Sequence, residues 1–513
     1  MNSEEKTRRK FGQHFTSRQT FEEFILPHIR DRLFDYIWVD MYAGSGNLIL
    51  PMLNHVPESK KIQFFKNHVY MFDVQKSWVT KCRRNATELG IPKNIAQKNI
   101  QVRNSLENPP DFLYELDKPI FHVTNPPYLY LGYIAKHEET QAYLRYFEDE
   151  NDGYQDLYQI AMINDLRSGI KNLAYIIPSN FLYGNSVSRK FRKDFLKHYS
   201  VEHAYIFEKK IFENTGTNVI VGFFHKKERP SHAIQEFQGE KYSSTKEIRH
   251  LQPKKRKYRL IPKYKYRAGA EFEEFVERRK IKNPLKYHYY LKEKDIKENA
   301  GNERLTLIDA NNYDGTQYVR ITRKVSKKFA EIVRKNLLWV RTVDTGSWEG
   351  RAGLYRIDQH FDVDGILVTK NTYRTNPIQL FIEPPISPEI QLVLKDYVNV
   401  ILQHLREVTD SEFMTTYKYS NHDYIRKYFG LRQLRKIIRT FPHNVLDDGL
   451  LEEFKEIVKK KDSEKILSFI DNLDDWDIKG LYVRSSFEIG DWARSSPTSK
   501  ADVKGLPSIF DES

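Results

Sequence analysis

Two consecutive prolines directly after an apolar run constrain the fold of this chain more than any other feature. Residues 119–123 read Pro-Ile-Phe-His-Val and predict a buried strand, which ends at Thr124-Asn125-Pro126-Pro127-Tyr128. Proline has a fixed φ and no amide hydrogen, and it pushes the preceding residue into extended backbone. The turn is therefore stiff and poor in donors. The Asn125 oxygen, the free carbonyls and the Tyr128 ring suit a flat ligand that carries an NH2 group.

The segments before this turn alternate between strand and helix patterns. Residues 37–47 indicate an apolar strand that runs into a glycine-containing turn, and residues 69–74 form a second apolar run with Asp73 near its end. A third run, 100–103, leads into Asn104-Ser105-Leu106. This alternation predicts a parallel sheet that binds ligands at the carboxyl ends of its strands.

Gly44 and Gly46 in the first turn let the backbone approach a ligand closely, and the helix start that follows presents unpaired N–H groups. The same turn can equally be a plain connection between a strand and a helix. Ile49 stands where the dinucleotide fingerprint has its third glycine, which disfavours a nicotinamide or a flavin. A smaller nucleoside ligand remains open, and Asp73 is placed to accept hydrogen bonds from its ribose.

Composition narrows the class of protein. A chain of 513 residues favours two domains, and a net charge of +14 favours a polyanionic partner, above all nucleic acid, over a merely solvated basic surface. Cys82 is the single cysteine, which excludes an intramolecular disulfide and a Cys-based zinc site. No apolar run approaches the ~20 residues of a membrane helix, and the N-terminus lacks a signal-peptide pattern. We therefore expect a cytoplasmic protein that makes no membrane contact.

The order of these motifs resembles that of the S-adenosylmethionine-dependent amino-methyltransferases of DNA. In particular it resembles the gamma class, the TaqI-methyltransferase-like group of restriction-modification enzymes, in which the cofactor motifs precede Asn-Pro-Pro-Tyr and a target-recognition domain follows. Each motif is weak by itself, whereas their order and spacing together are specific. The resemblance covers roughly residues 10–226, and the C-terminal half matches nothing by motif.

The resemblance implies an α/β fold with two domains. It predicts a Rossmann-like seven-stranded methyltransferase domain over residues 1–240 and a mixed α+β target-recognition domain over residues 250–494. The stretch Ser-Ser-Pro-Thr-Ser-Lys that begins at Ser495 predicts a disordered tail over residues 495–513. The boundary is expected in the polar and basic stretch between Lys227 and Lys257. The resemblance also places a fifth-strand motif at 173–182 and the sixth and seventh strands at 201–207 and 219–224. Apolar patterns predict strands at 337–341 and 365–370, and helices at 154–166, 389–405 and 424–438.

The resemblance also assigns the site residues. The catalytic motif is Asn125, Pro126, Pro127 and Tyr128. The implied cofactor is S-adenosyl-L-methionine, and its expected contacts are Phe15, Thr16, Asp40, Tyr42, Ala43, Gly44, Gly46, Asp73, Val74, Ser105, Leu106 and Asn125. Ser105 departs from the family, which usually has an acidic residue there, and a hydroxyl accepts a hydrogen bond more weakly than a carboxylate. No metal is expected.

The chemistry follows from the pocket. An adenine amine is a poor nucleophile because its lone pair is delocalised into the ring. If Asn125 Oδ1 and the Pro126 carbonyl accept its two hydrogens, they favour a tetrahedral nitrogen and aim the lone pair at the sulfonium methyl group. The nucleotide must first rotate out of the duplex, and we expect Tyr128 and Phe212 to stack on the extruded base. For His122, a structural role is favoured over that of a base.

Candidate contacts to DNA lie in the second half. Basic residues interleave with tyrosine at Lys254, Lys255, Arg256, Lys257 and Tyr258, which suits a phosphate backbone, although a strand with one solvated cationic face has the same pattern. Two polar loops offer Trp348 with Arg351, and Arg374, to a groove. Exposed polar loops mostly do nothing specific, so these assignments depend on the DNA hypothesis.

The sequence thus predicts a DNA adenine-N6 methyltransferase, the modification part of a restriction-modification system. Its expected partner is double-stranded DNA, a separate cognate restriction endonuclease is compatible with the resemblance, and we expect a monomer. Four alternatives stay open: methylation of the N4 amine of cytosine, of RNA or of a protein glutamine in the same pocket, and a non-catalytic DNA-binding protein that keeps the fold.

Overall fold

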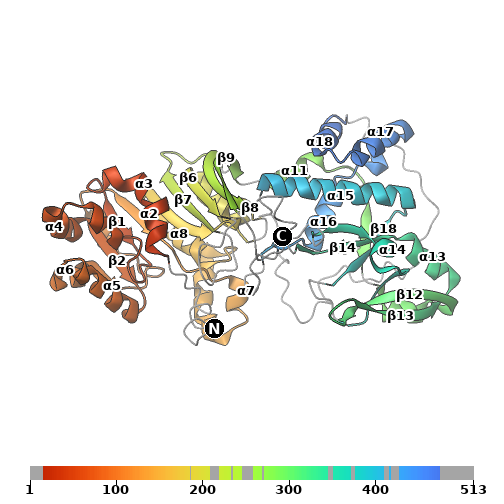
Figure 1. Ribbon diagram of the computed structural model, residues 1–513, viewed down its shortest axis with the longest axis horizontal. Coiled ribbons are helices and arrows are strands. Elements are labelled where there is room, and N and C mark those ends of the chain that lie inside the picture. Colours follow the sequence, from red (N-terminus) through yellow and green to blue (C-terminus); the bar gives the residue numbers. More distant parts are fainter. Residues whose placement is uncertain are drawn as a thin grey trace. The chain divides into compact units, whose positions relative to one another are not determined.

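The computed structural model describes residues 16–184, 187–207, 219–232, 235–244, 258–268, 271–289, 291–344, 351–370, 376–409, 415–416 and 427–473. The chain divides into two compact units, Met1–Ala270 and Glu271–Ser513 (Figure 1). Each unit has its own hydrophobic core.

Among the described residues of the first unit, nine strands form one sheet in the order β3-β2-β1-β4-β5-β7-β6-β8-β9. The strands are β1 (Ile37–Asp40), β2 (Val69–Asp73), β3 (Ile100–Val102), β4 (Ile120–Thr124), β5 (Asn172–Pro178), β6 (Tyr199–Phe207), β7 (Val219–Lys226), β8 (Gln235–Ser244) and β9 (Tyr258–Ala268). β1 to β5 run parallel, and β7 is antiparallel to both β5 and β6. The carboxyl ends of β1 to β5 therefore meet at one edge of the sheet.

The central strands are apolar at nearly every position because both of their faces are covered. All residues of β1 and β4 are buried, which is the pattern of parallel strands inside an α/β sheet. Trp38 and Phe121 are partners across β1 and β4, and their rings stack with centroids 5.1 Å apart. This packing fixes the register of the two strands whose ends carry Asp40 and Asn125.

Helical segments connect the strands. They are α2 (Arg18–Phe24), α3 (Leu26–Ile29), η1 (Arg30–Arg32), η2 (Leu50–His55), α4 (Glu58–His68), α5 (Lys76–Glu88), α6 (Lys93–Asn99), η3 (Asp111–Glu115), α7 (Leu131–Ile134), η4 (Glu138–Phe147), η5 (Asp149–Asn151), α8 (Leu157–Arg167), α9 (Asn180–Tyr183) and α10 (Arg189–His198). Ser17 caps α2, where its hydroxyl accepts the Thr20 amide at 3.2 Å. In α5 the residues Val79, Cys82 and Ala86 recur at helical spacing and are buried against the sheet.

Three sequence predictions for the first unit differ from the structure. The sheet has the seven expected strands plus β8 and β9, so it is wider than predicted. The division between units falls after Ala270 instead of between residues 240 and 250, because the polar stretch assigned to a linker pairs as β8 with β6 and β9. After the glycine turn the chain forms the 3-10 segment η2, with Pro51 near its start, instead of an α-helix.

In the second unit the described strands form three small sheets, with orders β10-β18-β14-β16, β11-β17-β12-β13 and β15-β20-β19. The strands are β10 (Lys286–Tyr289), β11 (Leu291–Lys292), β12 (Ala300–Tyr313), β13 (Tyr318–Val325), β14 (Leu338–Arg341), β15 (Val343–Asp344), β16 (Gly353–Arg356), β17 (Gly365–Val368), β18 (Ile378–Glu383), β19 (Thr415–Thr416) and β20 (Lys427–Tyr428). Both parallel and antiparallel pairs occur among these strands.

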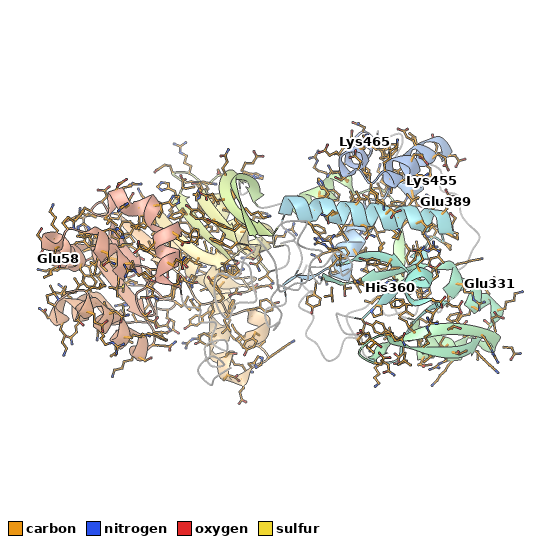
Figure 2. The ribbon with its side chains drawn as sticks, viewed as in Figure 1. Glu58, Glu331, His360, Glu389, Lys455 and Lys465 are labelled. Carbon is orange, nitrogen blue, oxygen red and sulfur yellow. The ribbon has the colours of Figure 1, made fainter. Side chains whose placement is uncertain are left out.

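Helices cover these sheets: α11 (Glu271–Arg279), α12 (Glu293–Glu298), α13 (Lys327–Lys335), α14 (Ile357–Phe361), α15 (Pro388–Thr409), α16 (Leu431–Ile438), η8 (His443–Val445), α17 (Asp448–Lys459) and α18 (Ser463–Asp471). The long helix α15 supplies much of the core through Leu394, Tyr397 and Ile401. Lys455 of α17 pairs with Glu389 of α15 at 3.0 Å (Figure 2).

The elements expected in the second half are mostly present. The strands at 337–341 and 365–370 correspond to β14 and β17, and the helix at 389–405 corresponds to α15. The helix expected at 424–438 begins only at Leu431. Residues 427–428 pair as strand β20 with β15 and β19, and the Gly430 amide donates to Gln433 Oε1 at 2.7 Å, which starts the helix there. The predicted tail, 495–513, lies outside the described residues.

Candidate active site

A cavity of about 410 Å³ lies at the carboxyl ends of the parallel strands in the first unit. Its wall combines the glycine turn after β1, the ends of β2 and β3, the proline turn after β4 and part of η4. A volume of this size is typical of small-molecule sites. Of the predicted site residues, the wall contains Thr16, Asp40, Tyr42, Ala43, Gly44, Asp73, Val74, Ser105, Leu106, Asn125, Pro126 and Pro127.

The glycine turn is closed by Asp73 from the neighbouring strand. The Gly44 amide donates to Asp73 Oδ2 at 2.9 Å, and the Gln75 amide donates to Asp73 Oδ1 at 2.8 Å. Burial raises the pKa of Asp73. A carboxylate has about four acceptor positions, so two remain for a ligand in the cavity.

Gly46 has a packing role in the structure. Its φ is +86°, and an added Cβ would lie 2.7 Å from Leu50 Cδ1 and 2.8 Å from Cys82 Sγ. Gly46 does not line the cavity, and its expected contact with a cofactor stays a prediction. Glycine is required here because η2 and α5 press against the back of the turn.

Asp40 is an acid buried in the cavity wall, with 1% of its surface exposed. Its Oδ1 accepts the Thr124 hydroxyl at 2.6 Å and the Tyr42 amide at 3.0 Å. Burial is the largest influence and raises the pKa of Asp40 to about 6. The site therefore contains a carboxyl group that changes charge near neutral pH.

Asn125 is oriented by two hydroxyl groups. Its Nδ2 donates to Thr16 Oγ1 at 3.0 Å, and its Oδ1 accepts from the Tyr128 hydroxyl. Thr16 is in turn held by Asn47, whose Nδ2 donates to the Thr16 carbonyl at 2.8 Å. An amide oxygen can accept two hydrogen bonds, so Tyr128 and a ligand do not exclude each other as partners of Asn125 Oδ1.

Tyr128 itself lies below the surface. It is 7% exposed, is not part of the cavity wall, and packs edge-on against Tyr158 with ring centroids 6.3 Å apart. Its hydroxyl lies within reach of the Ile176 carbonyl as well as of Asn125, and its single hydrogen can serve one of them at a time. Stacking of this ring on a base stays a prediction, and Phe212 and Phe15 lie outside the described residues.

Ser105 has an unused hydrogen-bonding group in the wall. It is 3% exposed, and its Oγ has no hydrogen-bond partner among the described residues. A buried hydroxyl without a partner costs free energy, which a ligand with a donor group at that point would remove. The neighbouring Asn104 is fixed instead, because its Nδ2 donates to the Tyr146 hydroxyl at 2.9 Å.

Sequence reasoning missed the contribution of η4. Glu139, Tyr143 and Tyr146 line the cavity from this segment, as does Arg145. The Tyr146 hydroxyl donates to Glu107 Oε1 at 2.8 Å, and Arg145 forms an ion pair with the same carboxylate. The segment is a 3-10 helix with no motif, so the sequence offered only its aromatic content as a signal. Trp78 and Arg103 line the cavity too and were also missed.

The predicted DNA contacts are mostly untested by the structure. Lys254 to Lys257, Trp348 and Arg374 lie outside the described residues, and Tyr258 is described only as the first residue of β9. Arg351 is half-buried, and its carbonyl accepts the Tyr355 hydroxyl at 2.5 Å.

None of the described helices combines the length and the apolar character that a membrane-crossing segment needs. Within the described ranges, His, Cys, Asp and Glu side chains form no group of three or more that could hold a metal ion.

Family comparison decides what kind of protein carries this cavity. The model of the N-6 DNA methylase family matches residues 1–312, which is more than half of the chain and includes the whole site described above. The chain belongs to the N-6 DNA methylase family. No curated protein matches the sequence of this chain closely enough to count as a relative.

One solved structure shares the fold of this chain at low sequence identity. The type IIL restriction-modification enzyme MmeI, in complex with DNA, is 12% identical with a TM-score of 0.50, over 92% of this chain and 74% of that one. The EcoKI modification protein of a type I restriction enzyme is 14% identical with a TM-score of 0.34, over 45% of this chain. This chain thus spans about half, 48%, of the length of the EcoKI protein.

Proposed function

We propose that this chain transfers a methyl group from S-adenosyl-L-methionine to the N6 amine of an adenine in double-stranded DNA. One observation carries the proposal: Asn125 and Pro126 share a cavity with the glycine turn and Asp73. This arrangement brings the acceptors for an amine beside the groups that suit a nucleoside. Membership in the N-6 DNA methylase family supports the same reaction.

The residues of the cavity fit the proposed donor. The unpartnered Ser105 Oγ can accept a hydrogen bond from the adenine amine of the donor, and Asp73 retains acceptor positions for a ribose diol. Asp40 and Asp73 give this wall acidic character, which suits a sulfonium. When bound, the donor supplies an electrophilic methyl group.

Asn125 and Pro126 would act on the target amine by position and electrostatics. Asn125 Oδ1 and the Pro126 carbonyl accept the two amine hydrogens, so the nitrogen becomes tetrahedral and its lone pair points away from the ring. Thr16 and Tyr128 hold the Asn125 carboxamide before the base arrives, so little reorganisation is needed. Neither acceptor is basic enough to keep a proton. The proton released by the methylated nitrogen therefore passes to water.

The second unit would serve as the target-recognition domain of a modification enzyme. Extrusion of the target nucleotide costs a few kcal/mol, and Tyr128 and Phe212 remain the candidate rings for the extruded base. Lys254 to Lys257, Tyr258, Trp348, Arg351 and Arg374 remain the candidate contacts to DNA. A separate restriction endonuclease would be the functional counterpart.

Labelled methyl transfer to four acceptors tests the proposed function. Purified protein is incubated with labelled S-adenosylmethionine and duplex DNA, single-stranded RNA, a mixed peptide pool or buffer. We expect label in DNA alone, recovered as N6-methyladenine after digestion to nucleosides. Recovery of N4-methylcytosine, or label in RNA or peptide, would replace adenine in DNA with one of the alternatives, and DNA binding without transfer would indicate a non-catalytic protein.

Donor affinity is expected to fall at acidic pH because Asp40 loses its charge. Burial raises the pKa of Asp40 to about 6, and the cationic donor favours the ionised form. The affinity is therefore full above pH ~7 and falls on the order of tenfold by pH 5, since bound donor lowers the pKa of Asp40. Calorimetric titration of S-adenosylmethionine at pH 5 to 7.5 measures the change.

The matched control is Asp40→Asn, which keeps an acceptor oxygen for Thr124 and Tyr42 but carries no charge. The affinity of this variant for the donor should not change over the same pH range. Burial also raises the pKa of Asp73, so Asp73→Asn separates the two acids. An Asp40→Asn profile as steep as the wild type would assign the pH dependence to another group.

A further inference from the structure

His122 lies on β4, three residues before Asn125. It is 0% exposed and does not belong to the cavity wall. The Met41 amide donates to His122 Nε2 at 3.2 Å. A backbone N–H can only donate, so Nε2 must be unprotonated and the ring hydrogen must lie on Nδ1. His122 therefore cannot serve as a base for the target amine, because its free nitrogen is already used.

Asp165 and Tyr175 fix this tautomer. His122 Nδ1 lies 2.7 Å from Asp165 Oδ2, and the Tyr175 hydroxyl donates to the same oxygen at 2.6 Å. Burial, and next the Asp165 carboxylate, raise the pKa of Tyr175 well above its ordinary value, so its hydroxyl stays protonated. Asp165 comes from α8 and Tyr175 from β5, and both are almost fully buried. The carboxylate thus accepts both hydrogens and holds the imidazole with Nε2 facing Met41.

Met41 stands between Asp40 and Tyr42, which both line the cavity. A second contact ties the same two strand ends together, because the Thr124 hydroxyl donates to Asp40 Oδ1 at 2.6 Å. The glycine turn is therefore attached to the catalytic strand at two neighbouring points, one through its backbone and one through a side chain. Nothing else in the proposed mechanism uses the first of these contacts.

We propose that His122 is a positioning residue for methyl transfer, which sets the glycine turn at a fixed distance from Asn125 by accepting the Met41 amide. The inference rests on the proposed function and adds residues that the family motifs do not contain. Transfer between two bound groups is sensitive to displacements of about 1 Å, so loss of this contact should act on the chemical step. A purely structural histidine would affect stability alone.

Two isosteric substitutions separate the two ring nitrogens. Glutamine places its oxygen near the position of Nε2, so His122→Gln can still accept the Met41 amide, whereas His122→Asn reaches only the position of Nδ1. We expect His122→Asn to lower kcat at saturating donor and DNA by about 10- to 100-fold. His122→Gln should recover at least about tenfold of that loss, although both variants lose similar thermal stability.

His68→Asn is the matched control for a buried histidine. His68 is 8% exposed, and its Nδ1 donates to the Tyr36 carbonyl at 2.8 Å, away from the cavity. We expect this variant to unfold at a lower temperature with kcat within about twofold of wild type. Asp165→Asn is a second probe, because the new amide can donate to Nδ1 and move the ring hydrogen to Nε2, which removes the acceptor for Met41 without touching His122.

The outcomes separate this inference from the proposed function. If His122→Gln and His122→Asn have equal kcat values, or if Asp165→Asn retains wild-type kcat while nitrogen-15 NMR shows the ring hydrogen of His122 on Nε2, His122 has a stability role and the inference is overturned. If the histidine variants do not fold, Asp165→Asn decides alone. If the wild-type protein binds no S-adenosylmethionine and methylates no DNA, the proposed function fails first and the inference falls with it.

Discussion

Replacing Asn125 with alanine is expected to lower the rate of methyl transfer by at least about 10³-fold and to leave donor affinity within about threefold of wild type. The substitution removes the side-chain oxygen proposed to accept a hydrogen of the target amine, and the second proposed acceptor, the Pro126 carbonyl, should not make the nitrogen tetrahedral alone. The contacts proposed between the donor and Asp73 and Ser105 should be unaffected. Single-turnover transfer of a labelled methyl group, together with calorimetric titration of the donor, measures both quantities.

Two further variants provide an intermediate case and a control for this experiment. Asn125→Asp keeps an acceptor oxygen but loses the amide hydrogen that Thr16 Oγ1 accepts, so it should fall between alanine and wild type. Asn94→Ala changes an exposed asparagine on α6 and should behave as wild type. Transfer by Asn125→Ala at a rate close to that of wild type would remove the carboxamide from the mechanism.

Asp73→Ala should weaken donor binding by about 100-fold while kcat at saturating donor changes little. The substitution leaves the Gly44 and Gln75 amides without their acceptor and removes the positions proposed for the ribose. Hydrogen bonds to a charged group contribute about 1.5–3 kcal/mol, and unpaired buried donors add to the cost, which together give this order of magnitude. Equilibrium titration of S-adenosylmethionine and of its demethylated product measures the loss.

Asp117→Ala is the control for a change of charge, because Asp117 is exposed and lies outside the cavity wall. An unchanged dissociation constant in Asp73→Ala would show that Asp73 only closes the turn. A loss of kcat at saturating donor would instead place Asp73 in the chemical step.

Most of the cavity could be predicted from the sequence because its residues follow apolar strands. The runs at 37–40, 69–74 and 119–123 indicate parallel strands, and the residues after such strands necessarily meet at one edge. Local motifs were therefore enough to predict that Asp40, Asp73 and Asn125 lie close together. Thr16 and Ser105, which line the same cavity, were found by the same order of motifs.

The missed features depend on pairing or on contacts between distant residues. β8 and β9 are polar, and only their pairing with β6 and each other makes them strands of the sheet. The contact between His122 and Asp165 joins residues 43 positions apart on a strand and a helix, with no motif at either. The burial of Tyr128 could not be predicted either, because its neighbours Tyr158 and Ile176 come from later segments.

In the second unit, individual elements were easier to predict than their assembly. The apolar run at 337–341 and the helical spacing over 389–405 are strong local signals. The three sheets, however, join strands as distant as β10 and β18, and the two-residue strands β15, β19 and β20 have no pattern of their own. Residues that read a base sequence cannot be recognised from such signals, because any exposed polar loop resembles them.

The most direct test of the central claim is modification-sensitive sequencing of DNA from cells that express this chain, compared with cells that express Asn125→Ala. We expect N6-methyladenine at one position of one recurring sequence in the first sample and none at that sequence in the second. Methylation on cytosine N4, or an unmodified genome in cells where the wild-type protein is folded and binds S-adenosylmethionine, would contradict it.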